Sequence, residues 1–357
     1  MQFKVTVKIW SILAVMTVTV LHADSKEWYR NDEMAILYEA LTKISSESLY
    51  RELQRISPQH ILENYIYKVD EYGDYFTKEE YQAFKQTLSQ KYAGIGMVLY
   101  QQKRDDRILC IPASKELESM GVVRYDQLIS VDGHLVKGRN FYVVSSWIRG
   151  RKNSSVTLKL QKASGELYSI TLKRTMQHFH SVVQRVLPNG IVTIQIIRFM
   201  KETPEELRRI LQQWPKNIPI VIDLRGNGGG DLFSGIQSAD LLLPKGSLIS
   251  SIETTKNCSD YRASNPDYTN GQSVLLLQDG FTASAAEVFI AALTQNHRAE
   301  SIGEKSFGKG VAQKFVFLSN GDALLLTYGK IITPNGESYH KKGLLPTTTS
   351  LLDESLK

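Results

Sequence analysis

Two segments in the last quarter of the chain contain residue types that could perform chemistry. Ser284 stands at the start of an expected helix, with Glu287 three residues later and small alanines on both sides. The S-x-x-E spacing is a capping box, so a plain helix cap explains it. A serine at a helix N-terminus also lies where developing negative charge is stabilised, and the alanines leave room for a substrate backbone. Both interpretations can hold for Ser284 together.

The second segment places Lys309 between Gly308 and Gly310, just before an alternating strand pattern at 314–318. A lysine in a loop is normally a solvated charge, but flanking glycines and apolar neighbours favour burial here. A buried lysine loses its proton readily and can serve as a base. Gln313 follows four residues later, and on an extended strand positions 309 and 313 face the same side.

A glycine-rich loop, Asp223–Gly230, follows the apolar strand pattern at 218–224. Its glycines leave backbone N–H groups open to a ligand. Phosphate binding is not supported, because the spacing fits neither G-x-G-x-x-G nor the P-loop pattern, and a carboxylate would repel phosphate. The loop is therefore either a tight turn or a cradle for an oxyanion.

The elements that must position these segments follow an alternating order from Met176 onward. Strands are expected at 191–197, 218–224 and 273–277, and helices at 203–214 and from Ser284. This rhythm predicts an α/β core with a largely parallel sheet. Asn320-Gly321 between two alternating stretches predicts a β-hairpin.

Two further regions precede this core. Residues 92–175 contain short strand patterns separated by turn signals, which predict a β-rich module. Residues 24–91 have apolar residues at helical spacing, with a break before Pro58 and a capping box at Thr77–Glu80. We therefore expect a helical N-terminal region.

The first 23 residues are typical of a secretory signal peptide. Lys4 and Lys8 precede an apolar run that ends at Leu21. Ala23 then offers a small residue for cleavage. The run is short for a membrane span, which needs about 20 apolar residues. The protein is expected to be exported, either periplasmic or secreted, or membrane-associated if the signal is not removed.

The composition excludes several classes of protein. The chain has 357 residues, 22% of them charged, and a net charge of +6. No basic run is interleaved with aromatic residues, so no nucleic-acid partner is expected. Seven histidines, none at H-x-x-x-H spacing, and two cysteines predict neither a metal site nor a cofactor. Cys110 and Cys258 could pair, although two separate thiols are the simpler interpretation.

Together, these segments resemble the carboxyl-terminal processing proteases, also called tail-specific proteases, which are Ser–Lys serine peptidases with a PDZ domain. Asp223–Gly230 resembles the family's D-L-R-x-N-x-G-G, Ala283–Glu287 its nucleophile segment, and Phe307–Gly310 its lysine segment. The β-rich module resembles its PDZ domain, and residues 333–346 its closing motif. The resemblance covers nearly all of the chain after residue 23.

The resemblance implies a multi-domain α/β fold. A helical N-terminal region (24–91) and a PDZ-like domain (92–175) would precede a serine protease core of the ClpP/crotonase-like type with a C-terminal segment (176–357). The resemblance implies Ser284 as the nucleophile, Lys309 as the base and Gln313 as the residue that orients the base. Our candidates for the oxyanion-hole donors are the backbone N–H groups of Gly229 and Ala285. The implied carboxylate-binding loop of the PDZ domain is Gly94, Ile95, Gly96 and Met97.

The implied mechanism requires Lys309 to be neutral. Lowering a lysine pKa from about 10.4 to about 7.5 takes roughly 4 kcal/mol, which burial can supply. Implied substrates are proteins or peptides with a free C-terminus, and the N-terminal helices could form a homodimer or pack on the chain's own core. The chain departs from many members at Ala286, Gln295 and His297. A non-catalytic peptide- or ligand-binding protein on the same scaffold is the alternative.

Overall fold

The structure is a computed structural model that describes residues 31–47, 58–87, 91–100, 107–112, 115–139, 141–178, 180–186, 190–269 and 271–348. The chain divides into two compact units, Met1–Ile61 and Leu62–Lys357. The expected signal segment 1–23 and the apolar stretch 49–56 lie outside the described residues.

Three helices lie in the N-terminal region: α1 (Asn31–Glu47), α2 (Pro58–Val69) and α3 (Lys78–Thr87). α2 begins at a proline, whose fixed φ and missing N–H suit the first turn of a helix. The capping box predicted before α3 is present. Glu80 Oε2 accepts the N–H of Thr77 at 2.7 Å, and Thr77 Oγ1 accepts the N–H of Glu80 at 3.2 Å.

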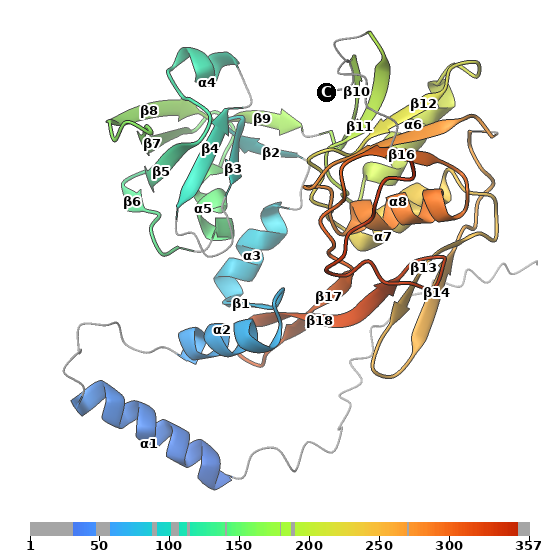
Figure 1. Ribbon diagram of the computed structural model, residues 1–357. Coiled ribbons are helices and arrows are strands. Elements are labelled where there is room, and N and C mark those ends of the chain that lie inside the picture. Colours follow the sequence, from blue (N-terminus) through green and yellow to red (C-terminus); the bar gives the residue numbers. More distant parts are fainter. Residues whose placement is uncertain are drawn as a thin grey trace, which may run out of the picture. The chain divides into compact units, whose positions relative to one another are not determined.

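The region from 91 to 178 is rich in β-strands (Figure 1). One antiparallel sheet has the order β3 (Met97–Tyr100), β4 (Ile108–Pro112), β5 (Asp126–Val131), β7 (Ser155–Gln161) and β8 (Leu167–Lys173), with β6 (His134–Leu135) beside β5. β2 (Lys91–Gly94) pairs with β9 (Thr175–His178). Alternate residues of β7, Val156, Leu158 and Leu160, are buried, as a one-sided sheet requires. Two helices belong to this module, α4 (Lys115–Ser119) and α5 (Phe141–Ile148).

The expected parallel sheet is present in the α/β core. Its strand order is β10 (Val182–Val186), β11 (Val192–Ile196), β12 (Ile220–Asp223), β15 (Val274–Gln278) and β16 (Glu300–Gly303). The last four strands run parallel, and β10 is antiparallel to β11. Its helices are α6 (Thr203–Gln213), α7 (Leu232–Asp240) and α8 (Ala285–Gln295). α8 is almost entirely buried, which explains its apolar sequence.

A second sheet in the core is antiparallel. The predicted hairpin forms β17 (Val311–Phe317) and β18 (Ala323–Ile332), and Gly321 in its turn has a φ of 89°. β13 (Leu248–Glu253) and β14 (Cys258–Arg262) extend this sheet. The strand β1 (Asp74–Phe76) was not expected, and it pairs with β18 from a distant part of the sequence.

An aromatic cluster joins the β-rich module to the core. The ring centroids of Phe76 and Phe315 are 5.5 Å apart, and those of Phe84 and Tyr142 are 4.8 Å apart. The ring of Tyr142 also lies 5.8 Å from that of Phe76. Aromatic pairs at these separations are stabilising beyond the area that they bury. The cluster therefore fixes α5 beside strands β1 and β17.

Two further findings concern the whole described chain. Among the residues placed by the structure, no helix is both long and apolar enough to cross a membrane. Cys110 is buried and Cys258 is exposed, and both are free thiols, so the two cysteines do not pair.

Candidate active site

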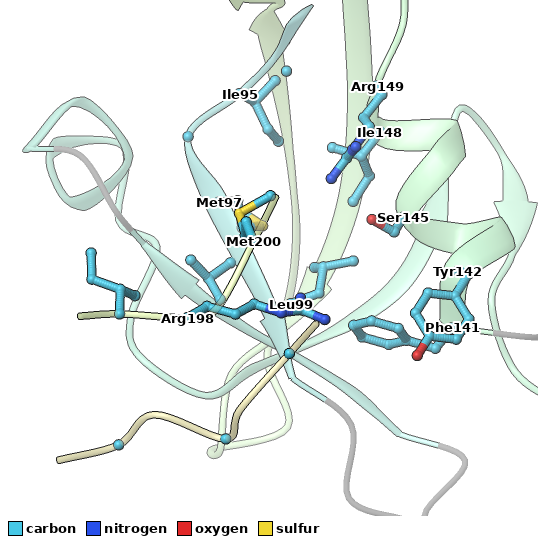
Figure 2. A pocket seen from close by; sticks show the side chains of 17 residues that line it. Ile95, Met97, Leu99, Phe141, Tyr142, Ser145, Ile148, Arg149, Arg198 and Met200 are labelled. Atoms are coloured by element: carbon cyan, nitrogen blue, oxygen red, sulfur yellow. The ribbon is translucent and has the colours of Figure 1, made fainter. Parts of the chain in front are cut away.

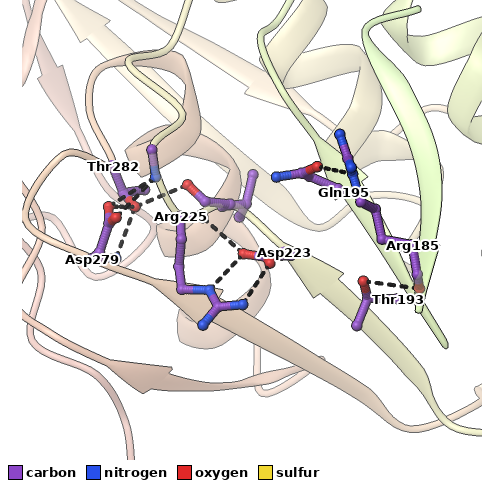
Figure 3. Close-up of polar contacts among 9 residues, drawn as sticks. Arg185, Thr193, Gln195, Asp223, Arg225, Asp279 and Thr282 are labelled. Atoms are coloured by element: carbon purple, nitrogen blue, oxygen red, sulfur yellow. Dashed lines mark hydrogen bonds and ion pairs between the residues drawn. The ribbon is translucent and has the colours of Figure 1, made fainter. Parts of the chain in front are cut away.

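The glycine-rich loop begins with an ion pair at the end of β12 (Figure 3). The buried carboxylate of Asp223 accepts hydrogen bonds from Arg225 Nε at 3.0 Å and Nη2 at 2.8 Å, and from the backbone N–H of Arg225 at 3.0 Å. The guanidinium group of Arg225 binds the carboxylate in a bidentate manner, which fixes the geometry of the ion pair as well as balancing its charge. The ion pair therefore holds the first residues of the glycine-rich loop in place.

The same loop is tied to the segment that leads into Ser284. The carboxylate of Asp279 accepts the N–H of Gly226 at 2.9 Å, and the hydroxyl of Thr282 donates to the carbonyl oxygen of Leu224 at 3.0 Å (Figure 3). The N–H of Ala283 donates to the carbonyl oxygen of Asn227 at 3.0 Å. These bonds place the glycines directly beside the predicted nucleophile.

Ser284 has an unusual backbone conformation. Its φ is 57° and its ψ is −119°, outside the regions that residues with a side chain normally occupy. Residues in such conformations cost about 1–3 kcal/mol and cluster at functional sites. Ser284 is the N-cap of α8, and its side chain is only half-buried. The turn therefore presents the serine at a helix N-terminus.

Gly229 approaches Ser284 so closely that no other residue fits. A Cβ atom on Gly229 would lie 2.8 Å from the Cβ of Ser284 and 3.0 Å from the backbone nitrogen of Ala285. The N–H of Gly229 donates to Oδ1 of Asn227 at 2.8 Å, and the amide nitrogen of Asn227 donates to the carbonyl oxygen of Ile196. The N–H of Ala285 has no acceptor in the described part of the chain.

The Glu287 side chain is fully buried, at 0% exposure, and joins the two segments with candidate chemistry. Its Oε2 accepts the backbone N–H of Ser284 at 2.8 Å, which is the predicted capping interaction, and also the backbone N–H of Lys309 at 2.8 Å. Its Oε1 accepts the hydroxyl of Ser306 and the N–H of Gly308, both at 2.6 Å. One carboxylate therefore sets the position of the lysine loop against the start of α8.

All four partners of Glu287 donate hydrogen, so the carboxylate form satisfies every one of them. Burial nevertheless raises the pKa of the Glu287 carboxyl, while these hydrogen bonds act in the opposite direction. Desolvation and hydrogen bonding therefore have opposite effects on the pKa of this carboxyl group. The sequence revealed Glu287 as a helix cap but not as the link to Lys309.

The structure brings Lys309 and Gln313 together. Nζ of Lys309 donates to Oε1 of Gln313 at 2.8 Å, and Nε2 of Gln313 donates to the carbonyl oxygen of Tyr72 at 2.7 Å. Both side chains are half-buried. Sequence reasoning missed Tyr72, because its position beside Lys309 depends on a contact between distant parts of the chain.

A cavity of about 490 Å³ lies between the β-rich module and the glycine-rich loop (Figure 2). The predicted carboxylate-binding residues Gly94, Ile95, Gly96 and Met97 line it, together with one face of α5 and with Gly226, Gly228 and Gly230. Gly96 has a φ of 67°, a conformation that favours glycine. The side chains of Phe141 and Ile148 make part of the α5 face of the cavity apolar, Ser145 contributes a hydroxyl group, and Arg149 and Arg198 add positive charge.

No group of three or more His, Cys, Asp and Glu side chains that could hold a metal ion lies among the residues that the structure describes. Around Ser284 the structure places a serine at a helix N-terminus, a glycine in close approach, and a lysine on a loop that shares the carboxylate of Glu287 with it.

Comparison with known proteins identifies the family. Residues 190–350 match the model of Peptidase family S41. The carboxy-terminal processing protease CtpA of Bacillus subtilis is 32% identical over 293 residues, which are 81% of this chain and 62% of that protein. A CtpA-like serine protease of Staphylococcus aureus is 32% identical over 288 residues, 78% of this chain and 57% of that protein.

Among solved structures, the photosystem II D1 C-terminal processing protease has the same fold, with a TM-score of 0.60 and 20% identity. That match covers 90% of this chain and 93% of the other chain. Residues 190–350 of this chain match the S41 peptidases, so the predicted resemblance and the α/β fold class are confirmed. The chain spans about three fifths of the length of the curated relatives that it matches.

Proposed function

We propose that this protein is a serine-type endopeptidase of the carboxyl-terminal processing kind, with Ser284 as nucleophile and neutral Lys309 as general base. The observation that supports this most strongly is the bonding of Glu287, whose Oε2 accepts the N–H groups of both Ser284 and Lys309 at 2.8 Å. A buried carboxylate that holds both segments at once suits a site in which their side chains act together.

In the proposed reaction, Oγ of Ser284 attacks the scissile carbonyl carbon while its proton passes to Nζ of Lys309. The tetrahedral intermediate collapses, the C–N bond breaks, and the leaving amine takes the proton from Lys309. A water molecule, deprotonated by the same lysine, then attacks the carbonyl carbon of the acyl-enzyme. The ester C–O bond breaks, Oγ of Ser284 takes the proton from Lys309, and the second product is released. Gln313 orients the amine through its side-chain oxygen, at 2.8 Å from Nζ.

The oxyanion of the intermediate would be bound by backbone N–H groups of Gly229 and Ala285. The support for Ala285 is its position at the N-terminus of α8 and its lack of an acceptor in the described part of the chain. The N–H of Gly229 donates to Asn227. Its proposed role therefore requires that bond to be shared or exchanged when substrate binds.

We further propose that substrates are proteins or peptides read at a free C-terminus. The predicted loop Gly94–Met97 lines the same cavity as the glycine-rich loop that precedes the site. In a common form of peptide recognition, the peptide adds a strand to the edge of a sheet. The backbone N–H groups of a neighbouring loop then bind its terminal carboxylate. The apolar face of α5 favours apolar residues near the substrate's end.

Export, to a periplasm or outside the cell, is proposed from residues 1–23 alone. A homodimer through the N-terminal helices likewise stays a prediction. In α1 the side chains of Ile36, Leu37 and Tyr38 are exposed, which is compatible with a partner surface. No metal, cofactor or nucleic acid enters the proposed activity.

The test is incubation of the purified protein with β-casein, beside the Ser284→Ala variant. The proposal expects fragments from the wild type and none from the variant, with circular dichroism showing equal folding. Cleavage by both proteins would show a different nucleophile. No cleavage by either, together with binding of peptides in the cavity, would favour the non-catalytic binding protein.

A further inference from the structure

The aromatic ring and the backbone carbonyl of Tyr72 both face the Lys309–Gln313 pair. Tyr72 lies on the segment between α2 and β1, outside the α/β core in sequence. We propose that Tyr72 is a positioning residue for the lysine base: its carbonyl fixes the amide of Gln313, and its ring stabilises the charge that Lys309 acquires. The inference rests on the proposed function, and its test is designed to fail separately from it.

The carbonyl of Tyr72 determines which end of the Gln313 amide faces the lysine. Nε2 of Gln313 donates to this carbonyl oxygen at 2.7 Å, which leaves Oε1 to accept from Nζ of Lys309 at 2.8 Å. The reversed amide would place its oxygen against the carbonyl oxygen of Tyr72 and, once Lys309 is protonated, its NH₂ group against the ammonium, so two attractive contacts would become repulsive. The backbone of Tyr72 thus selects the amide orientation that serves the lysine.

The ring of Tyr72 lies under the reacting amine. Nζ of Lys309 is 4.9 Å from the ring centroid, within the distance of about 6 Å at which a cation is attracted to an aromatic face. Lys309 gains a positive charge when it takes the proton of Ser284. The ring therefore stabilises the state that follows proton transfer more than the neutral base before it, which is the condition for lowering a barrier.

Tyr72 is itself held in place from the core. The carboxylate of Asp70 accepts the N–H of Tyr72 at 3.1 Å and, on the β18 side, the N–H and hydroxyl of Thr327 at 2.7 and 2.9 Å. The ring of His340 lies 5.9 Å from the Tyr72 ring. Bonds of this kind fix a short segment far more firmly than its own sequence would, so the ring and carbonyl are available at fixed positions.

Other charged groups surround the pair and must be considered in any pH experiment. Glu287 lies on α8, and the exposed Glu71–Lys341 ion pair, at 3.0 Å, joins the Tyr72 segment to the 339–343 loop. His340 of that loop and Lys330 of β18 lie nearby. Burial raises the pKa of the Tyr72 phenol and lowers that of His340, so both stay neutral near pH 7. Replacing the Tyr72 ring keeps every one of these groups in the chain, but it removes the ring that His340 faces.

The test measures kcat/KM against pH with a fluorogenic peptide for the wild type, Tyr72→Phe and Tyr72→Leu. Loss of the ring should favour the neutral amine, so the midpoint of the acidic limb in Tyr72→Leu should move down by about half a pH unit to one unit. The plateau at high pH should fall by about 10-fold, because the ammonium that forms is less stabilised. Tyr72→Phe keeps the ring, so the midpoint of its acidic limb should equal that of the wild type.

A series of fluorinated residues separates the effect of the ring's negative face from that of a folding defect. Phenylalanine, difluorophenylalanine and trifluorophenylalanine in place of Tyr72 keep nearly the same shape while weakening the negative face of the ring. The acidic limb should move down step by step along the series. An unmoved limb across the series, or equal losses in Tyr72→Phe and Tyr72→Leu, would overturn the proposal.

A readout independent of activity separates this inference from the proposed function. In the Ser284→Ala background, the rate of acetylation of Nζ of Lys309 by acetic anhydride is followed against pH by mass spectrometry. Addition of Tyr72→Leu should move the midpoint to lower pH, in the same direction as the kinetic limb. If the wild type cleaves nothing but this shift is found, the proposed function fails and the contact stands; an unmoved midpoint overturns the contact whatever the activity.

Discussion

The amine of Lys309 and the amide oxygen of Gln313 lie 2.8 Å apart, although the two residues belong to different kinds of structure. Lys309 lies in a loop between two glycines, whereas Gln313 is in β17, next to a register shift after Ala312. The contact shows that the hairpin formed by β17 and β18 positions the amine of Lys309, while Glu287 holds the backbone of its loop.

Gln313→Ala should lower kcat/KM by about 10- to 150-fold, because a hydrogen bond to a charged group is worth roughly 1.5–3 kcal/mol. Gln313→Glu should act differently. A carboxylate beside Nζ stabilises the ammonium and raises the pKa of Lys309, so the acidic limb of the kcat/KM profile should move to higher pH. A pH profile unchanged in Gln313→Glu would show that this residue does not face the base in solution.

Glu287→Gln should abolish most activity. All four partners of the carboxylate are donors, so an amide NH₂ would face at least one N–H or O–H group without an acceptor. We expect a loss of at least 100-fold in kcat/KM and about 3 kcal/mol in the free energy of unfolding, measured by urea denaturation. The control is Glu337→Gln at an exposed position, which should change neither. Normal activity in Glu287→Gln would remove the main support for the proposed site.

Gly229→Ala should reduce both activity and stability. Gly229 has a φ of 93°, and a Cβ atom there would lie 2.6 Å from the carbonyl oxygen of Ala283. Gly246 is the matched control, because it also has a φ of 93°, lies outside the cavity, and a Cβ on it would meet nothing within 4 Å. We expect Gly246→Ala to keep most of its kcat/KM and Gly229→Ala to lose about 100-fold or more, the usual effect of disturbing an oxyanion-hole donor. Equal effects of the two variants would contradict the assigned geometry.

Peptides with a free C-terminus should be cleaved faster than the same peptides amidated there. Charge-assisted hydrogen bonds to a carboxylate are worth roughly 1.5–3 kcal/mol, so the ratio of kcat/KM values should be about 10 to 150. Gly96→Val should reduce this ratio, because a side chain would block the backbone approach and a φ of 67° disfavours valine. Equal rates for both peptides would mean that the cavity beside Gly94–Met97 does not read the C-terminus.

Local sequence patterns predicted those parts of the structure that depend on neighbouring residues. The caps at Thr77 and Ser284, the parallel strands and the hairpin around Gly321 all have signals within a few positions. The free state of Cys110 and Cys258 also agrees with the simpler interpretation of two lone cysteines. His297, one of the departures from the family, has a φ of 56°, a conformation that favours glycine.

The parts that the sequence did not reveal depend on long-range contacts. β1 is three residues long and pairs with β18 about 250 positions away, so no periodicity could reveal it. Tyr72 reaches Gln313 because Asp70 binds Thr327, a bond between residues far apart in the chain. The strained φ of Ser284 likewise occurs where Gly229, from a distant part of the sequence, approaches closely.

The most direct measurement of the central claim restores the amine of Lys309 chemically. Lys309→Cys should be inactive on a fluorogenic peptide, because a thiol cannot replace the amine at its position. Alkylation with bromoethylamine converts that cysteine to a lysine-like side chain and should restore cleavage, whereas alkylation with iodoacetamide should not. Wild type treated in the same way controls for the exposed Cys258. Activity in untreated Lys309→Cys, or equal rescue by both reagents, would contradict the role of Lys309 as the base.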